Sequence, residues 1–192
     1  FTALVTALNS DPFWGVRAAA AEANGTKTSD AAQTVLLDAL KALDPKEFSQ
    51  ARIAIIQALG KFQAPQQSEP AQRSAQVLAA LLEQGDISYR VESTSAEMLG
   101  RTHTPGVIEI LEKQLARPSW TFMLQRGIFA GLAQTGEDRA LEIIEGYAIN
   151  PNNHPMLRRH ALSGLVIAGR QHYLYSETAR QQAVTTLLHA LE

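Results

Sequence analysis

Apolar residues recur at intervals of three and four along most of the chain, which places them on one face of an α-helix. The stripe is clearest in three sets of positions: Ala32, Leu36, Leu40 and Leu43; Ala71, Ala75, Leu78 and Leu82; Ile108, Leu111 and Leu115. No stretch sustains the period-two alternation of a half-buried strand, so the pattern predicts an all-α protein. We expect eleven helices, at about 2–10, 13–24, 28–43, 46–61, 70–84, 88–99, 105–116, 120–134, 137–149, 154–168 and 176–190.

The helical pattern is organised as an internal repeat. Arg17, Arg52 and Glu92 each precede a glycine by eight residues, and Gln125 and Arg158 lie at the same offset from the ends of two later segments. Successive positions of this set are 33 to 40 residues apart, the length of two helices and two turns. The period predicts an α-solenoid of about five helical hairpins, wound as a right-handed superhelix, in which each hairpin completes the core of its neighbours. We treat residues 1–192 as one such repeat domain.

Proline, aspartate and glycine mark the expected turns. Asp11-Pro12 and Asp44-Pro45 predict an N-cap followed by proline at the first helical position, where the missing N–H costs nothing. Glycines follow the second helix of each hairpin, where we expect left-handed residues that end the helix. These glycines are Gly25, Gly60, Gly100, Gly136 and Gly169.

Composition narrows the chemistry of the chain. It has 192 residues, a net charge of −2 and no cysteine, which excludes disulfides, thiolate nucleophiles and cysteine-based zinc sites. The five histidines include no pair three or four residues apart, so we predict no metal, no other cofactor and no catalytic residue. The balanced charge and short apolar runs predict a cytoplasmic protein with no nucleic-acid partner and no membrane span.

The repeated charged position has two readings. Arg17, Arg52 and Arg158 either form a structural ladder, each bonded to an acid or carbonyl of a neighbouring turn such as Asp11 or Asp44, or line an inner face that contacts a partner or a peptide carboxylate. The ladder is the favoured reading. Glu92 at the equivalent position would then pair with a neighbouring arginine.

Aromatic residues lie at the starts of second helices: Trp14, Phe48, Tyr89 and Trp120. The favoured reading is a wedge that seals each hairpin. The alternative is an exposed row for docking, since tryptophan and tyrosine often anchor protein interfaces.

Two further charged clusters have a simple explanation. Glu142 and Glu145 lie three residues apart, and we expect a solvated acidic helix face rather than a catalytic pair. A mildly basic end, near Tyr173 and Tyr175, is formed by Arg158, Arg159 and Arg170. Stacking and phosphate contacts would use such groups, but the acidic balance of the whole chain argues against nucleic acid.

The turn between helices, with Asp-Pro and then Val-Arg or Ala-Arg, resembles HEAT repeats. A narrower resemblance rests on Asp11-Pro12-Phe13-Trp14-Gly15-Val16-Arg17 and on Ser88-Tyr89-Arg90-Val91-Glu92, which look like the C-terminal HEAT-like region of bacterial zinc aminopeptidases of the aminopeptidase N family. The zinc-binding His-Glu-x-x-His helix and the Gly-Ala-Met-Glu-Asn segment of that family do not occur here.

This resemblance implies a non-catalytic domain from the C-terminal part of a longer peptidase. Zinc would be bound by the catalytic domain of the same polypeptide, which this domain would pack against, helping to enclose the peptide substrate. The alternative is a stand-alone HEAT scaffold that binds another protein through its concave face. A third reading, a HEAT-like chromophore lyase or its chaperone subunit, finds no cysteine or dedicated acid in the sequence to support it.

Overall fold

A computed structural model describes residues 1–46, 49–63 and 68–190, and these residues contain eleven α-helices and no strand. In chain order the helices are α1 (Thr2–Ser10), α2 (Trp14–Gly25), α3 (Asp30–Ala42), α4 (Ser49–Leu59), α5 (Glu69–Gln84), α6 (Tyr89–Arg101), α7 (Val107–Gln114), α8 (Met123–Leu132), α9 (Asp138–Ile149), α10 (Pro155–Arg170) and α11 (Glu177–His189). Short 3₁₀ turns, η1 (Trp120–Phe122) and η2 (His172–Leu174), precede α8 and α11. Each α-helix overlaps one predicted range, so the all-α prediction is confirmed.

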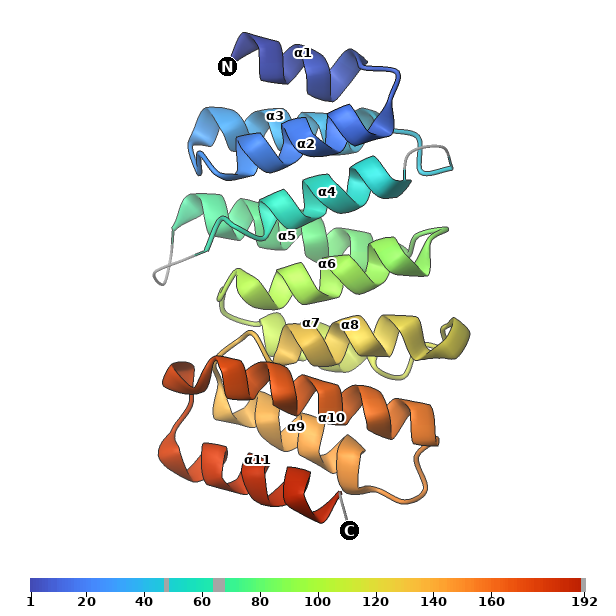
Figure 1. Ribbon diagram of the computed structural model, residues 1–192, viewed down its shortest axis with the longest axis vertical. Helices are drawn as coiled ribbons and strands as arrows, with labels where there is room; N and C mark the ends of the chain where they lie inside the picture. The colour runs from blue at the N-terminus through green and yellow to red at the C-terminus, as the bar shows by residue number, and fades with distance from the viewer. Residues whose placement is uncertain (47–48, 64–67, 191–192) are drawn as a thin grey trace.

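The helices form two layers of an elongated stack (Figure 1). The even-numbered helices lie in front in that view and pack on one another in succession, while α3, α5 and α7 lie behind them and α1 and α11 lie at the two ends. The two termini lie at opposite ends of the stack. This arrangement is an α-solenoid of five hairpins, α1/α2 to α9/α10, with α11 added on α9 and α10.

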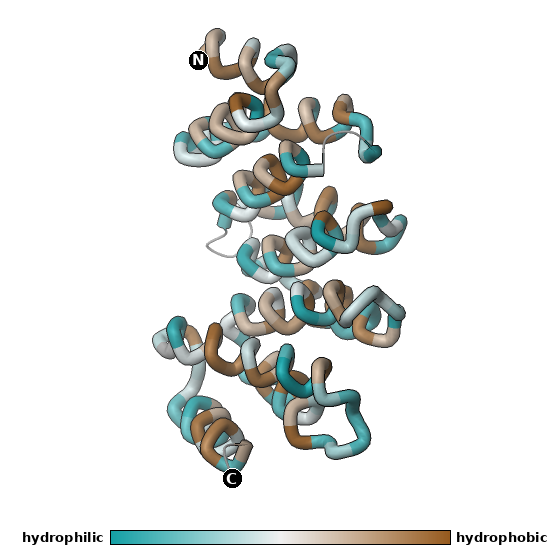
Figure 2. The backbone as a smooth tube through the Cα atoms, turned by 45° about the vertical axis from the view of Figure 1, so that its right-hand side comes forward, coloured by the Kyte–Doolittle hydropathy of each residue, from teal (hydrophilic) through white to brown (hydrophobic). Residues whose placement is uncertain are grey.

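The core runs continuously between the two layers. It contains Leu36 from α3, Ile56 from α4, Leu78 from α5, Leu99 from α6 and Phe129 from α8, each with no exposed surface. Figure 2 shows hydrophobic and hydrophilic positions alternating around single helices, as expected for helices that bury one side. No helix among the described residues is both long and apolar enough to cross a membrane.

Glycines within the even helices allow close packing rather than ending those helices. A Cβ on Gly100 would lie 1.9 Å from the carbonyl oxygen of Gly131, and one on Gly127 would lie 2.1 Å from that of Ser93. The even helices pack closely on one another in succession, while the odd helices contact one another less, so we call the even-helix layer the inner layer and the odd-helix layer the outer layer. The left-handed caps predicted at these positions are therefore wrong, except at Gly136, where φ is 77°.

The Asp-Pro pairs also act differently from the prediction. The Oδ1 atom of Asp11 accepts a hydrogen bond of 2.8 Å from the Phe13 N–H, and Asp44 binds the Lys46 N–H at the same distance. Each aspartate therefore closes a turn before the helix, and α2 begins only at Trp14. The prolines lie within these turns instead of at the first helical position.

Candidate functional site

The repeated charged position holds the turns between helices together. The Arg17 Nε–H donates to the backbone oxygen of Asp11 at 2.5 Å, in the turn before α2. The Arg158 Nε–H donates to the backbone oxygen of Ala148 at 3.0 Å, near the end of α9. These side chains therefore make the carbonyl contacts that a structural ladder requires.

The middle of the ladder is a buried ionic network. The Nη2 atom of Arg52 lies 2.6 Å from Oδ2 of Asp86, and both side chains are 4% exposed. Asp86 lies in the turn after α5, so the acid that pairs with Arg52 belongs to the next hairpin and is not Asp44. Glu92 accepts a hydrogen bond from the Asp86 N–H at 3.0 Å and pairs with Arg117, which lies in the turn after α7. The network thus connects three successive hairpins.

The aromatic residues do not seal the hairpins. Trp14 is 48% exposed, Tyr89 is 40% exposed and Trp120 is 71% exposed. They begin α2, α6 and η1, at the edge of the stack where the even helices start (Figure 1). A ring that sealed a hairpin would be buried, so these exposed fractions do not fit the wedge interpretation at these three positions. Phe48 lies outside the described residues.

The acidic pair and the C-terminal tyrosines divide between surface and core. Glu142 is exposed but Glu145 is buried, so the expected acidic face is wrong for Glu145. Burial raises the pKa of Glu145 above its ordinary value, with a smaller contribution in the same direction from Glu142. Tyr173 is exposed, whereas the buried Tyr175 hydroxyl donates to a backbone oxygen of the α8–α9 turn at 2.9 Å.

The described residues hold no group of three or more side chains placed to bind a metal ion.

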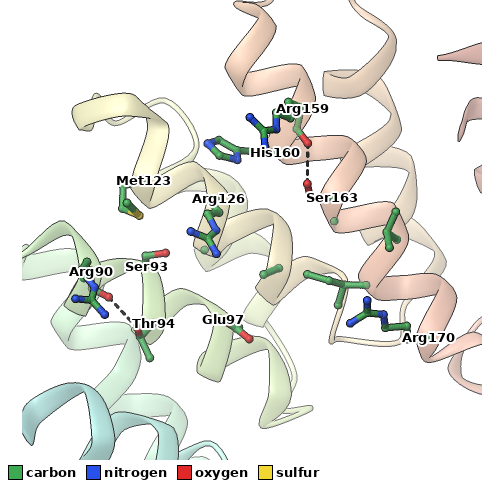
Figure 3. A pocket seen from close by; sticks show the side chains of 15 residues that line it. Arg90, Ser93, Thr94, Glu97, Met123, Arg126, Arg159, His160, Ser163 and Arg170 are labelled. Atoms are coloured by element: carbon green, nitrogen blue, oxygen red, sulfur yellow. Dashed lines mark hydrogen bonds between the residues drawn. The ribbon is translucent and has the colours of Figure 1, made fainter. Parts of the chain in front are cut away.

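A groove of about 740 Å³ crosses the inner, even-helix face (Figure 3). We call it the arginine groove. Side chains from three successive inner helices line it. They are Arg90, Ser93, Thr94 and Glu97 of α6, Met123, Arg126, Gly127 and Ala130 of α8, and Arg159, His160, Ser163, Gly164, Val166, Ile167 and Arg170 of α10.

Small residues explain why this part of the inner face is hollow. Gly127, Ala130 and Gly164 line the groove with little or no side chain. At Gly127 the absence of a Cβ is required, because α8 approaches the backbone of α6 there. The same residues that let the inner helices pack closely therefore leave space between the longer side chains around them.

The groove carries an excess of positive charge. Its lining contains four arginines and one carboxylate, that of Glu97. All four arginines are exposed, and the structure gives them no ion pair or side-chain hydrogen bond with any described residue. By contrast, Arg139 on α9 pairs with Glu109 and Glu112 at 2.8 Å. Arginines outside the groove thus form intramolecular ion pairs, whereas the four arginines that line it form none with the described residues.

His160 lies within this positive field. Its Nε2 is 3.4 Å from the backbone oxygen of Thr121. Partial burial lowers the pKa of His160, and the charges of Arg126 and Arg159 lower it further. The imidazole is therefore neutral at neutral pH, and the charge of the groove comes from its arginines.

The arginine groove was not predicted from the sequence. Arg159 and Arg170 were noted only as a basic end, and Arg90 and Arg126 were not candidates. The sequence does contain one signal of this groove. Arg126 and Arg159 are separated by 33 residues, which is a period of the repeat. Equivalent positions of neighbouring hairpins lie side by side, so this spacing indicates adjacent charges.

Comparison with known proteins agrees with a solenoid of HEAT-like hairpins. Residues 1–86 match the family model described as HEAT repeats. A solved structure, the complex of CpcE and CpcF of phycocyanin lyase from Nostoc sp. PCC7120, contains a chain that is 19% identical, with a TM-score of 0.60. The similarity covers 89% of this chain and 65% of that chain. At this identity it shows a shared fold. No curated protein matches the sequence, and these findings provide no link to an aminopeptidase.

Proposed function

We propose that this chain is a non-catalytic helical-repeat scaffold that binds a protein partner through its inner face. The observation that carries the proposal is the arginine groove, a hollow across α6, α8 and α10 whose four guanidinium groups lack partners among the described residues. Exposed charges without intramolecular partners are free to contact another molecule. A solenoid offers such a surface because its inner helices present equivalent positions side by side.

Two of the three hydroxyl groups that line the groove favour binding over catalysis. Thr94 donates to the backbone oxygen of Arg90 at 2.8 Å, and Ser163 donates to that of Arg159 at 3.0 Å. A nucleophilic hydroxyl needs a general base as its hydrogen-bond acceptor. These hydroxyl groups instead use their hydrogens within their own helices.

The structural neighbour supports a protein partner in a limited way. That neighbour was solved as a complex of two proteins, CpcE and CpcF. A similar solenoid therefore works together with a second chain, and we extend that property, but not its activity, to this protein.

The proposal can be tested by selecting peptides from a random displayed library against the intact chain. Selected peptides should slow amide hydrogen exchange in α6, α8 and α10. Ser163→Trp, which places a large ring at an exposed position of the groove, should abolish their binding. Lys113→Trp places the same ring on the outer helix α7 and is the matched control. Equal binding to both variants, or protection confined to the outer layer, would contradict the proposal.

A second candidate function is an appendage of a zinc aminopeptidase, packed on a catalytic domain of the same polypeptide. The observation that favours it lies in the run that carries the resemblance. Phe13 and Trp14 are 58% and 48% exposed, and their ring centroids are 5.6 Å apart, which gives an apolar surface suited to docking. Sequencing the coding DNA upstream of Phe1 tests this candidate. An upstream reading frame with a His-Glu-x-x-His helix would support it, and a frame without those ligands would contradict it.

A further inference from the structure

We propose that the arginine groove recognises an acidic segment of a protein, whose carboxylates pair with guanidinium groups while an intervening apolar side chain enters the groove. This inference rests on the proposed scaffold function and specifies the chemistry of its partner. It concerns Arg90, Arg126, Arg159 and Arg170, none of which belonged to the structural ladder.

The first argument is charge complementarity. Four cations and one carboxylate share one hollow, so the local charge is positive although the net charge of the chain is −2. Burial is the main cause of the lowered pKa of His160, and the charges of Arg126 and Arg159 lower it further, as expected in a positive groove. A ligand that brings carboxylates into the groove would relieve the repulsion among these cations.

The second argument is the placement of the cations. Arg90, Arg126 and Arg159 come from α6, α8 and α10, one from each successive inner helix, and Arg170 lies further along α10 (Figure 3). A segment that crosses the helices would therefore meet one guanidinium at each helix. The planar guanidinium forms two parallel hydrogen bonds to a carboxylate, which favours acidic side chains over single neutral acceptors.

The third argument distinguishes a protein segment from a nucleic acid. Met123, Val166 and Ile167 also line the groove, and Val166 is 47% exposed. These side chains suit an aliphatic residue placed between acids. Proteins that bind single-stranded nucleic acid instead provide aromatic rings on which bases stack. The lining contains no phenylalanine, tyrosine or tryptophan, and its single imidazole is that of His160.

The experiment uses two labelled peptides of about twelve residues. One repeats Glu-Glu-Leu, and its neutral twin repeats Gln-Gln-Leu. Binding to the intact chain is measured by fluorescence anisotropy at about 50 mM salt, where exposed charges are weakly screened. We expect the acidic peptide to bind at least about tenfold more tightly than its twin, and its affinity to fall as salt rises.

A pair of double variants assigns the effect to the groove. Arg126→Gln/Arg159→Gln should weaken binding of the acidic peptide at least about tenfold, since each substitution removes a charge-assisted pair. Lys41→Gln/Lys113→Gln removes the same net charge from the exposed outer helices α3 and α7, and should change affinity less than about twofold. Circular dichroism of each variant establishes that it is folded.

Each other outcome is decisive. Equal affinity for both peptides, or binding of neither, would overturn the acidic specificity. If displayed peptides still protect α6, α8 and α10 in that case, the scaffold function stands. If no displayed peptide binds the inner face, the scaffold function fails as well. Tighter binding of a twelve-nucleotide oligothymidine than of the acidic peptide, lost in Arg126→Gln/Arg159→Gln, would replace the protein partner by a nucleic acid.

Discussion

The buried pair of Arg52 and Asp86 gives the sharpest prediction about stability. Substituting Asp86 by alanine removes the carboxylate 2.6 Å from the Arg52 guanidinium and leaves that cation in a site where its side chain is 4% exposed. The Nε and Nη1 atoms of Arg52 have no hydrogen-bond partner among the described residues, so the guanidinium has little to replace the lost contact. We expect unfolding to become easier by about 3–5 kcal/mol, the cost of breaking a buried ion pair from one side.

Two related variants separate the contributions to this loss. Asp86→Asn keeps an oxygen that can accept the Ser88 N–H, which Oδ1 now binds at 2.9 Å, so it should lose less than Asp86→Ala. The double variant Arg52→Met/Asp86→Leu removes both charges and should recover most of the stability, because no uncompensated cation remains buried. Together with the single variants Arg52→Met and Asp86→Leu, the double variant completes a cycle that measures the coupling of the pair.

Urea unfolding followed by circular dichroism is the assay, with the free energy taken from the midpoint and slope. Arg73→Gln provides the control, since Arg73 forms an ion pair with Asp30 at 2.8 Å in which the side chains are 36% and 75% exposed. An exposed pair should contribute no more than about 1 kcal/mol. A loss below about 1 kcal/mol for Asp86→Ala would refute the claim that this network holds adjacent hairpins together.

Three further predictions concern other parts of the structure. Because burial raises the pKa of Glu145, the folded state binds its proton more tightly than the unfolded chain does, and stability falls as pH rises through the folded pKa. Glu145→Gln should remove this loss, so that the free energy of unfolding at pH 7 rises relative to that at pH 4. If urea unfolding gives the variant the same pH dependence of this free energy as the parent protein, a raised pKa of Glu145 is refuted. Tyr175→Phe removes a hydrogen bond of 2.9 Å and should cost about 1 kcal/mol, and ultraviolet titration of the native protein should show one phenol with a pKa of about 12. Ionisation of Tyr175 near pH 10, the ordinary value for a phenol, would be inconsistent with its burial. Gly100→Ala places a Cβ 1.9 Å from the Gly131 oxygen and should lower the melting temperature, at a cost of about 1–3 kcal/mol. Gly146→Ala, in α9 with no atom within 4 Å of the added Cβ, should instead stabilise the fold by up to about 1 kcal/mol; similar effects of the two changes would refute the packing role.

The sequence alone determined the helices and their order. The three-and-four spacing of apolar residues depends on contacts within a single helix, and turn residues such as Asp11 act on their immediate neighbours. The repeat period then implied stacked hairpins, because equal units that cannot bury their apolar faces alone must pack on one another. These features are local or periodic, so they can be read before any helix is placed in space.

Only the tertiary structure decided which charges pair with one another and which have no ion-pair partner among the described residues. Arg52 and Asp86 are 34 residues apart in sequence, and their contact depends on how one hairpin stacks on the next. The same stacking turned Gly100 from an expected helix cap into a point of close helix contact. It also brought Arg126 and Arg159 into one groove whose lining contains a single carboxylate, that of Glu97, and the 33-residue spacing of the two arginines could not show this scarcity of acids. A side chain's partner is set by distances across helices, and those distances follow from packing rather than from position in the chain.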